Sequence, residues 1–218
     1  MAEFGDIFGK TPVLHPAGRE RILMLMATDK ELGPHLKSLI EPAIIGVGPV
    51  EAAAGTAAAL GYLLARDEMP TRIVSLGSAG SRTLEQGAVY QVASVSYRDI
   101  DASALGFEKG RTPFSDHPHD IALETPFGET PKARLSTGGK VISGADYDPI
   151  DADMVDMESF AVVRAAARFK VPVVGLRGIS DGAEELRHYN DWASTLEALD
   201  AHLASALSLY LARLAESD

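Results

Sequence analysis

The chain contains no cysteine, which excludes a disulfide framework and any chemistry that depends on a thiolate. Its six histidines are scattered and form no spaced set of ligands, so the sequence argues against a zinc site. No apolar run approaches the roughly 20 residues that a membrane-spanning helix needs. The first residues lack the charged segment and apolar core that mark a secretion signal. We therefore expect a cytoplasmic protein without a bound metal and without a membrane partner.

The chain also has few positively charged residues relative to its negatively charged ones. The chain has 20 Lys and Arg residues against 31 Asp and Glu residues, a formal net charge of −11 at pH 7. Such a balance repels nucleic acid and anionic lipid headgroups at long range. A length of 218 residues can bury a sizeable core and is usual for one α/β domain. The composition therefore indicates a single domain whose partner is a small molecule and not a nucleic acid.

Apolar segments of strand length frame a helical segment in the first third of the chain. Residues 22–27 and 43–47 are apolar runs of strand length, and an alanine-rich stretch from Pro49 to Arg66 has helical spacing. Residues 72–76 are expected to form the strand that follows. This β-α-β order predicts a parallel sheet with right-handed crossovers.

The remaining segments continue the alternation around one long loop. Residues 1–20 hold prolines and glycines and are predicted to form an N-terminal arm, which leaves residues 21–218 as the domain. The other expected elements are a strand at 87–97, a proline-rich loop at 98–132, a strand at 140–144, a helix at 159–168, a buried strand at 171–176 and a helix at 192–214.

Three carboxylates stand where predicted strands end. Glu31 follows the first strand, Glu158 directly precedes the helix at 159–168, and Asp181 follows the strand at 171–176. Strand ends at one edge of an open α/β sheet are where such folds build their sites. A lone Glu31 would usually be a solvated cap, but three converging carboxylates suit protonation of one group and activation of water on the other side, as glycosidic-bond cleavage requires.

Two glycine-containing motifs follow strands as well. Gly77-Ser78-Ala79-Gly80 has small residues that either let backbone N–H groups approach a ligand oxygen or make an ordinary tight turn. Gly46-Val47-Gly48 begins like a dinucleotide-binding fingerprint, but Glu51 replaces its third glycine. The incomplete fingerprint argues against a nucleotide cofactor, and we expect none.

From about Arg21 to the final helix, the chain resembles the 5′-methylthioadenosine/S-adenosylhomocysteine nucleosidases of the purine nucleoside phosphorylase superfamily. The motifs that carry this resemblance, in order and at similar spacing, are Glu31-Leu32, Gly46-Val47-Gly48-Pro49-Val50, Leu76-Gly77-Ser78-Ala79-Gly80, Tyr97-Arg98-Asp99 with Gly106-Phe107-Glu108, Ile142-Ser143-Gly144, Asp156-Met157-Glu158 and Arg177-Gly178-Ile179-Ser180-Asp181. The resemblance implies a single-domain, three-layer α/β/α fold with a mixed, largely parallel central sheet.

The same resemblance assigns catalytic roles to two carboxylates. Asp181 would be the general acid that protonates the imidazole-ring nitrogen of the departing purine, and Glu31 would orient and deprotonate the attacking water. Glu158, with the backbone of Met157, would hold the ribose hydroxyls. Ser78 would contribute near the water or the ribose.

Two aromatic residues complete the set that the resemblance implies. Tyr147 occupies the place of an aromatic residue that stacks on the purine. Phe107 matches an aromatic residue that closes the pocket of the 5′ substituent from a neighbouring subunit, which implies a homodimer. The family's helix between the Pro113 region and the Ile142 region is not expected here, because three prolines interrupt that stretch.

The first hypothesis is therefore hydrolysis of the N-glycosidic bond of a 5′-substituted adenosine, with release of adenine and no cofactor. A phosphate-dependent phosphorylase of the same fold is the second, and a nucleoside-binding protein without turnover is the third. No arginine stands at Thr28, Asp29 or Ser75, where the phosphorylases place an anion site, and the carboxylate of Glu31 would repel phosphate. Arg177 is interpreted as the structural partner of a buried carboxylate.

Overall fold

A computed structural model of the protein describes residues 10–182 and 184–216. Its elements are β1 (Leu14–Ala17), β2 (Glu20–Met26), η1 (Asp29–Glu31), α2 (Pro34–Lys37), β3 (Ala43–Ile44), α3 (Pro49–Ala65), β4 (Arg72–Gly80), β5 (Val89–Tyr97), η2 (Ser103–Leu105), β6 (Ile121–Ala122), β7 (Lys132–Thr137), η3 (Gly144–Tyr147), β8 (Met154–Asp156), α4 (Ser159–Arg168), β9 (Val173–Asp181), α5 (Tyr189–Ala193) and α6 (Leu196–Ala215), where η marks a 3-10 helix.

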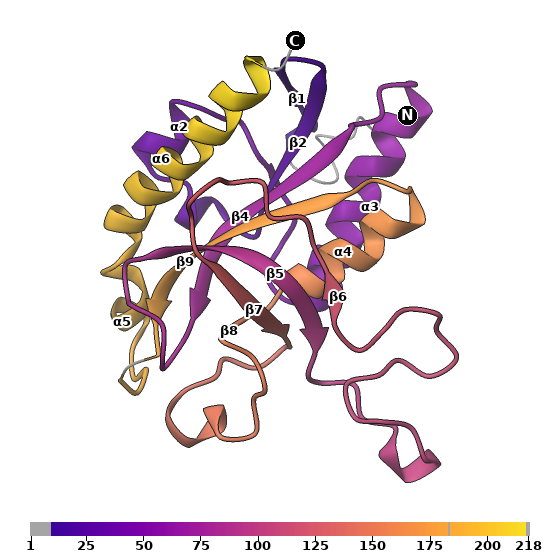
Figure 1. Ribbon diagram of the computed structural model, residues 1–218, viewed down its shortest axis with the longest axis vertical. Coiled ribbons are helices and arrows are strands. Elements are labelled where there is room, and N and C mark those ends of the chain that lie inside the picture. The colour runs from indigo at the N-terminus through magenta and orange to yellow at the C-terminus, as the bar shows by residue number, and fades with distance from the viewer. Residues whose placement is uncertain (1–9, 183, 217–218) are drawn as a thin grey trace.

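One mixed sheet of nine strands forms the centre of the described chain (Figure 1). Strand β4 pairs in parallel with β2 and β9 and antiparallel with β8. Strand β5 pairs in parallel with β7 and antiparallel with β9 and β6, and β7 runs parallel to β8. The pairings β4–β8–β7–β5–β9–β4 thus close a circuit, so this part of the sheet curls on itself.

Helices cover both faces of the sheet, in agreement with the expected three-layer α/β/α fold (Figure 1). Successive residues of β2 point to opposite faces. Leu23 and Leu25 pack in the cluster that includes residues of α3 and α4, whereas Ile22 and Met24 pack in the cluster that includes residues of α2 and α6. Burial on both faces explains why this strand is a continuous apolar run.

The strand predicted at residues 140–144 is wrong. The strand of this region is β7, Lys132–Thr137, which follows directly after Pro131. A proline just before a strand leaves the ladder intact, although the proline-rich context predicted a loop. Residues 141–143 have no regular structure, and the carbonyl oxygens of Gly138 and Lys140 accept hydrogen bonds from the guanidinium group of Arg98 instead of from a neighbouring strand.

The final helix, predicted as one segment at 192–214, is divided into α5 and α6. The division falls at Thr195, whose hydroxyl donates to the carbonyl oxygens of Ser180 and Trp192. A side chain that bonds to the backbone in this way competes with continued helix formation. Helix α5 is thereby tied to the end of β9.

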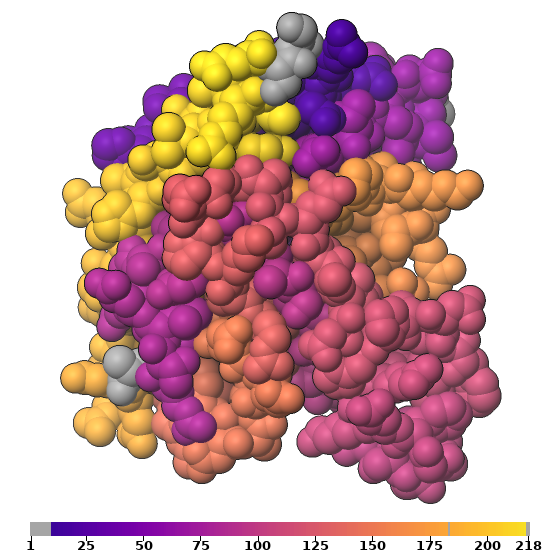
Figure 2. Space-filling view, viewed as in Figure 1, coloured from indigo at the N-terminus to yellow at the C-terminus, as the bar shows by residue number. Residues whose placement is uncertain are grey.

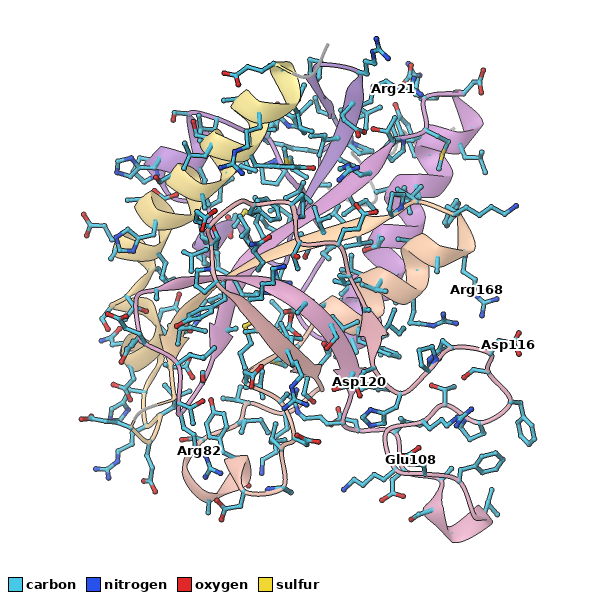
Figure 3. All side chains as sticks on the ribbon, in the orientation of Figure 1. Arg21, Arg82, Glu108, Asp116, Asp120 and Arg168 are labelled. Carbon is cyan, nitrogen blue, oxygen red and sulfur yellow. The ribbon has the colours of Figure 1, made fainter. Side chains whose placement is uncertain are left out.

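The described part of the N-terminal segment and the long loop lie at the edges of the sheet. Of residues 1–20, those from 10 onward are described, and they add strand β1 to the sheet next to β2. The loop of residues 98–132 is poor in regular structure, as expected, and residues near Glu108 and Asp116 project from the sheet at the lower right of Figures 2 and 3. None of the helices in the described part of the chain is long and apolar enough to cross a membrane.

Candidate active site

A cavity of about 600 Å³ lies where β2, β4, β8 and β9 end. Its volume falls in the range of small-molecule sites. The described residues that line it include five of the residues singled out from the sequence, namely Glu31, Ser78, Met157, Glu158 and Asp181. These residues are far apart in the chain, and the pairing of the strands brings them together.

Glu31 enters the cavity from the short helix η1, which begins after β2. Its side chain is held by Ser78 on β4, whose backbone N–H and hydroxyl both donate to Oε1, at 2.7 and 2.5 Å. A Cβ on Gly77 would stand 3.3 Å from Oε2 of Glu31, so the glycine leaves room for the carboxylate. The motif that includes Gly77 and Ser78 is therefore the end of a strand and not a tight turn.

Asp181 is the last residue of strand β9, and it is paired with Gly80 on the neighbouring strand β4. A Cβ on Gly80 would stand 2.9 Å from Oδ2 of Asp181 and 2.6 Å from the hydroxyl of Tyr147, so a side chain at this position would displace these two groups. The hydroxyl of Ser180 donates to Oδ1 of Asp181. Burial raises the pKa of Asp181 above its ordinary value, and the Ser180 hydrogen bond opposes the rise. The carboxyl group is thus disposed to carry a proton.

Glu158 is the N-cap residue of α4, and it reaches across to the turn before α3. Its Oε1 accepts a hydrogen bond of 2.8 Å from the backbone N–H of Gly48. Burial, reinforced by the negative charge of Asp156, raises the pKa of Glu158 to about 7. Near neutral pH this carboxyl group can therefore accept or donate a hydrogen bond to a hydroxyl of a bound ligand.

Arg177 lies behind the cavity and binds Asp156, with Nε and Nη2 each 3.2 Å from Oδ2. The same guanidinium group donates to the hydroxyl groups of Ser75 and Ser159. Arg177 is therefore the structural partner of a buried carboxylate, as predicted. Its charge favours the ionised form of Glu158, which limits the rise in that pKa.

The two predicted aromatic residues do not line the cavity. Tyr147 is 5% exposed and packs with Ile142 and Val155 behind the cavity wall. Its hydroxyl has no hydrogen-bond partner among the described residues, and Arg82 lies over its ring, 5.9 Å from the centroid. Phe107 lies in the projecting loop, where its ring meets that of Phe114 edge to face at 5.4 Å.

Several residues of the cavity wall were not predicted from the sequence. Trp192 and Tyr189 come from α5, and Arg98 and Lys140 come from the segments beside β7. Trp192 was predicted only as the first residue of the final helix, although the indole N–H of the chain's single tryptophan could have signalled a polar contact. Arg98 belongs to the motif Tyr97-Arg98-Asp99 that carries the resemblance, but no role was predicted for it. Tyr189 and Lys140 carried no signal in the sequence, because their place depends on how the loops fold back.

The chain is similar to known proteins in sequence and in structure. The profile of the phosphorylase superfamily matches residues 121–212. The 5′-methylthioadenosine/S-adenosylhomocysteine nucleosidase of Halalkalibacterium halodurans is 29% identical over 182 residues, covering 74% of this chain and 77% of the relative. The nucleosidase of the same description from Haemophilus influenzae strain PittEE is 33% identical over 159 residues, covering 64% of this chain and 66% of the relative.

Solved structures share the fold at lower identity. The futalosine hydrolase of Helicobacter pylori strain 26695 has a TM-score of 0.74 and 20% identity, covering 88% of this chain and 97% of that one. The nucleosidase of Colwellia psychrerythraea 34H, solved with adenine, has a TM-score of 0.72 and 20% identity, covering 93% and 97%. The fold is thus that of the nucleoside phosphorylases. On sequence and on structure, the chain is similar to the 5′-methylthioadenosine/S-adenosylhomocysteine nucleosidases of this superfamily.

Proposed function

We propose that this protein hydrolyses the N-glycosidic bond of a 5′-substituted adenosine, methylthioadenosine or S-adenosylhomocysteine, and releases adenine. The observation that carries the proposal is that Glu31 and Asp181, from separate strand ends, line one cavity together with Glu158. The nucleosidase relatives named above support the same substrate class.

In the proposed reaction, Asp181 gives its proton to the imidazole-ring nitrogen of the purine as the bond to the sugar breaks. The raised pKa of Asp181 keeps the proton available for this step. The ribosyl group then has oxocarbenium character, which nearby carboxylates stabilise. Glu31 takes a proton from the attacking water, whose oxygen forms the new bond to the anomeric carbon. The products are the free base and the 5′-substituted ribose.

Glu158 and the backbone of Met157 hold the ribose hydroxyls in this proposal. Glu158 suits the role because its pKa of about 7 allows it both to accept and to donate hydrogen bonds. Tyr147 lies beside the cavity and stacks on the purine when it turns toward the ligand. This movement would also give its unpaired hydroxyl a new environment.

Water, and not phosphate, is the proposed nucleophile. Arg177 does not line the cavity, and its donors are already engaged with Asp156, Ser75 and neighbouring groups. Arg98 does line the cavity, but both of its Nη groups donate to backbone carbonyl oxygens. The carboxylate of Glu31 would in addition repel a phosphate anion. Both features favour hydrolysis over phosphorolysis.

Homodimeric assembly and a cytoplasmic location belong to the same proposal. The projecting loop presents apolar side chains, since Leu105 is 77% and Phe114 95% exposed, and Phe107 packs on Phe114. A second copy of the chain would cover this surface if Phe107 closed the partner's 5′ pocket.

Release of base from a panel of nucleosides tests the proposal. Methylthioadenosine, S-adenosylhomocysteine, adenosine and inosine would be incubated with the protein, each with and without phosphate. We expect adenine and a free 5′-substituted ribose at a rate that phosphate does not change. A sugar 1-phosphate as product, or a strict need for phosphate, would instead identify a phosphorylase. Binding without release from any nucleoside would contradict enzyme activity.

A further inference from the structure

Trp192, the only tryptophan of the chain, makes a polar contact inside the cavity. Its indole Nε1 lies 3.0 Å from the hydroxyl oxygen of Ser78, which in turn lies 2.5 Å from Oε1 of Glu31. Three residues from α5, β4 and η1 therefore form one hydrogen-bonded chain. Its far end is the carboxylate that the proposed function uses as a base.

The chemistry of the three groups fixes the direction of both hydrogen bonds. An indole N–H can only donate, and an ionised carboxylate can only accept. The hydroxyl of Ser78 has a single hydrogen, so it must accept from Trp192 and donate to Glu31. A hydroxyl polarised by an accepted hydrogen bond is also the stronger donor, because linked hydrogen bonds reinforce one another.

The two oxygens of Glu31 are consequently different. Oε1 accepts from the backbone N–H and from the hydroxyl of Ser78. Oε2 has no hydrogen-bond partner among the described residues and lies beside Gly77, which has no side chain to cover it. The held oxygen orients the carboxylate, and the other oxygen is left to receive a proton.

The position of Trp192 is itself fixed from two sides. The hydroxyl of Thr195 donates to the carbonyl oxygens of Trp192 and Ser180, at 3.0 and 3.1 Å. Ser180 is the neighbour of Asp181, so the same tie reaches the strand end that carries the proposed acid. The ring of Tyr189 also meets the indole edge to face, with centroids 5.4 Å apart.

We propose that Trp192 is a positioning residue which, through the hydroxyl of Ser78, commits Oε1 of Glu31 to a fixed orientation and leaves Oε2 as the proton acceptor for water. The inference rests on the proposed function and adds a residue to it. Without the indole N–H, the hydroxyl of Ser78 would be free to turn toward the ligand. Trp192 thus directs Ser78 toward the base and away from the ribose.

A double-substitution cycle tests this role on methylthioadenosine, with the parent protein, Trp192→Phe, Ser78→Ala and the combined variant. Phenylalanine keeps an aromatic ring at the cavity but has no N–H group. We expect Trp192→Phe to lower kcat about tenfold, the effect of losing one hydrogen bond in a chain that ends on a charge. In the Ser78→Ala background the same substitution should lower kcat less than about twofold, because the connecting hydroxyl is gone.

Asn190→Ala is the matched control, since Asn190 is exposed on the same helix and does not line the cavity. It should leave kcat and the melting temperature at the parental values, which excludes a general disturbance of α5. An equal loss of kcat from Trp192→Phe in both backgrounds would show that the ring acts by packing alone and would overturn the inference. Parental kcat in Trp192→Phe would overturn it as well.

Fluorescence gives a reading that needs no turnover. Because the chain has one tryptophan, its emission reports on Trp192 alone. Ser78→Ala should shift the emission maximum, whereas Asn190→Ala should not, and an unchanged maximum in Ser78→Ala would refute the contact. If the parent protein released no base from any nucleoside, the proposed function itself would be refuted. An active parent without coupling in the cycle would refute only the role of Trp192.

Discussion

Arg177 and Asp156 form an ion pair that is almost completely buried, with Nη2 3.2 Å from Oδ2 and side-chain exposures of 3% and 1%. Asp156 also accepts from the hydroxyl groups of Thr137 and Ser159. Every charged atom of the pair thus has a partner, which is the condition for tolerating charge in a protein interior. Asp156 ends β8 two residues before Glu158, so the pair supports the wall of the proposed active site.

Arg177→Met should destabilise the protein by about 3–5 kcal/mol, because it leaves the charge of Asp156 buried without its partner. Urea denaturation would measure the change in the free energy of unfolding. Arg134→Met is the matched control, since Arg134 pairs with the exposed Asp151 and its loss should cost only about 0–1 kcal/mol. Equal effects of the two substitutions would show that the buried pair has no special role.

Glu158→Gln should raise the melting temperature at pH 8 but not at pH 4. The pKa of Glu158 is raised to about 7 from 4.5, so below pH 4.5 the group is protonated in both the folded and the unfolded state. As the pH rises from 4.5 to 7, only the unfolded state ionises, and the stability of the parent falls. Glutamine removes this penalty, and each kcal/mol regained is worth about 2–4 °C.

Thermal unfolding at the two pH values would measure this difference, with the exposed Glu85→Gln as a control that should show none. A gain of the same size at pH 4 would point to packing instead of charge. We also expect Glu158→Gln to weaken nucleoside binding, since the amide cannot change its protonation to suit a ribose hydroxyl.

Asp181→Asn should lower kcat on methylthioadenosine by about 10²–10⁴-fold, because an amide cannot deliver a proton to the leaving purine. The pKa of Asp181 is raised by burial, so the parent should lose activity as the pH rises through that value and the acid form disappears. The variant's residual activity should lack this basic limb. Asp151→Asn, at an exposed carboxylate, is the control. A kcat within a few-fold of the parent in Asp181→Asn would remove Asp181 from the mechanism.

Glu31→Gln should abolish hydrolysis while leaving ligand binding largely in place, because the proposed role is to position and deprotonate water. The amide can still accept from Ser78 through its oxygen, so the site should keep its shape. Calorimetry with a nucleoside and single-turnover kinetics would separate binding from chemistry. Lost binding with unchanged chemistry would make Glu31 a ribose ligand.

Phe107→Ala should weaken substrates with apolar 5′ groups more than it weakens adenosine, because only the former would use the aromatic surface. Sedimentation should show the parent as a homodimer at micromolar concentration. Phe114→Ala is the informative comparison, since Phe114 shares the same loop and supports the ring of Phe107. A monomeric parent that discriminates between these substrates equally well would contradict a shared pocket.

Local sequence signals predicted the elements that bury both faces. Continuous apolar runs such as the one in β2, and helical spacing such as that in α3, identify their element because burial leaves few other choices. The strand at β7 was missed and one at 140–144 was wrongly expected, since the carbonyl oxygens of Gly138 and Lys140 bond to Arg98, from another segment. A local sequence pattern cannot predict a hydrogen-bond partner that comes from a distant segment.

The sequence by itself determined the class of fold, and it placed three carboxylates after strands that could share one edge. Only the tertiary structure decided that Glu31, Glu158 and Asp181 line one cavity, that burial raises two of their pKa values, and that Trp192 contacts the hydroxyl of Ser78. The physical reason is that periodicity records which face of an element is buried. Distances, desolvation and hydrogen-bond partners between segments are set by strand pairing and by the return of loops over the sheet.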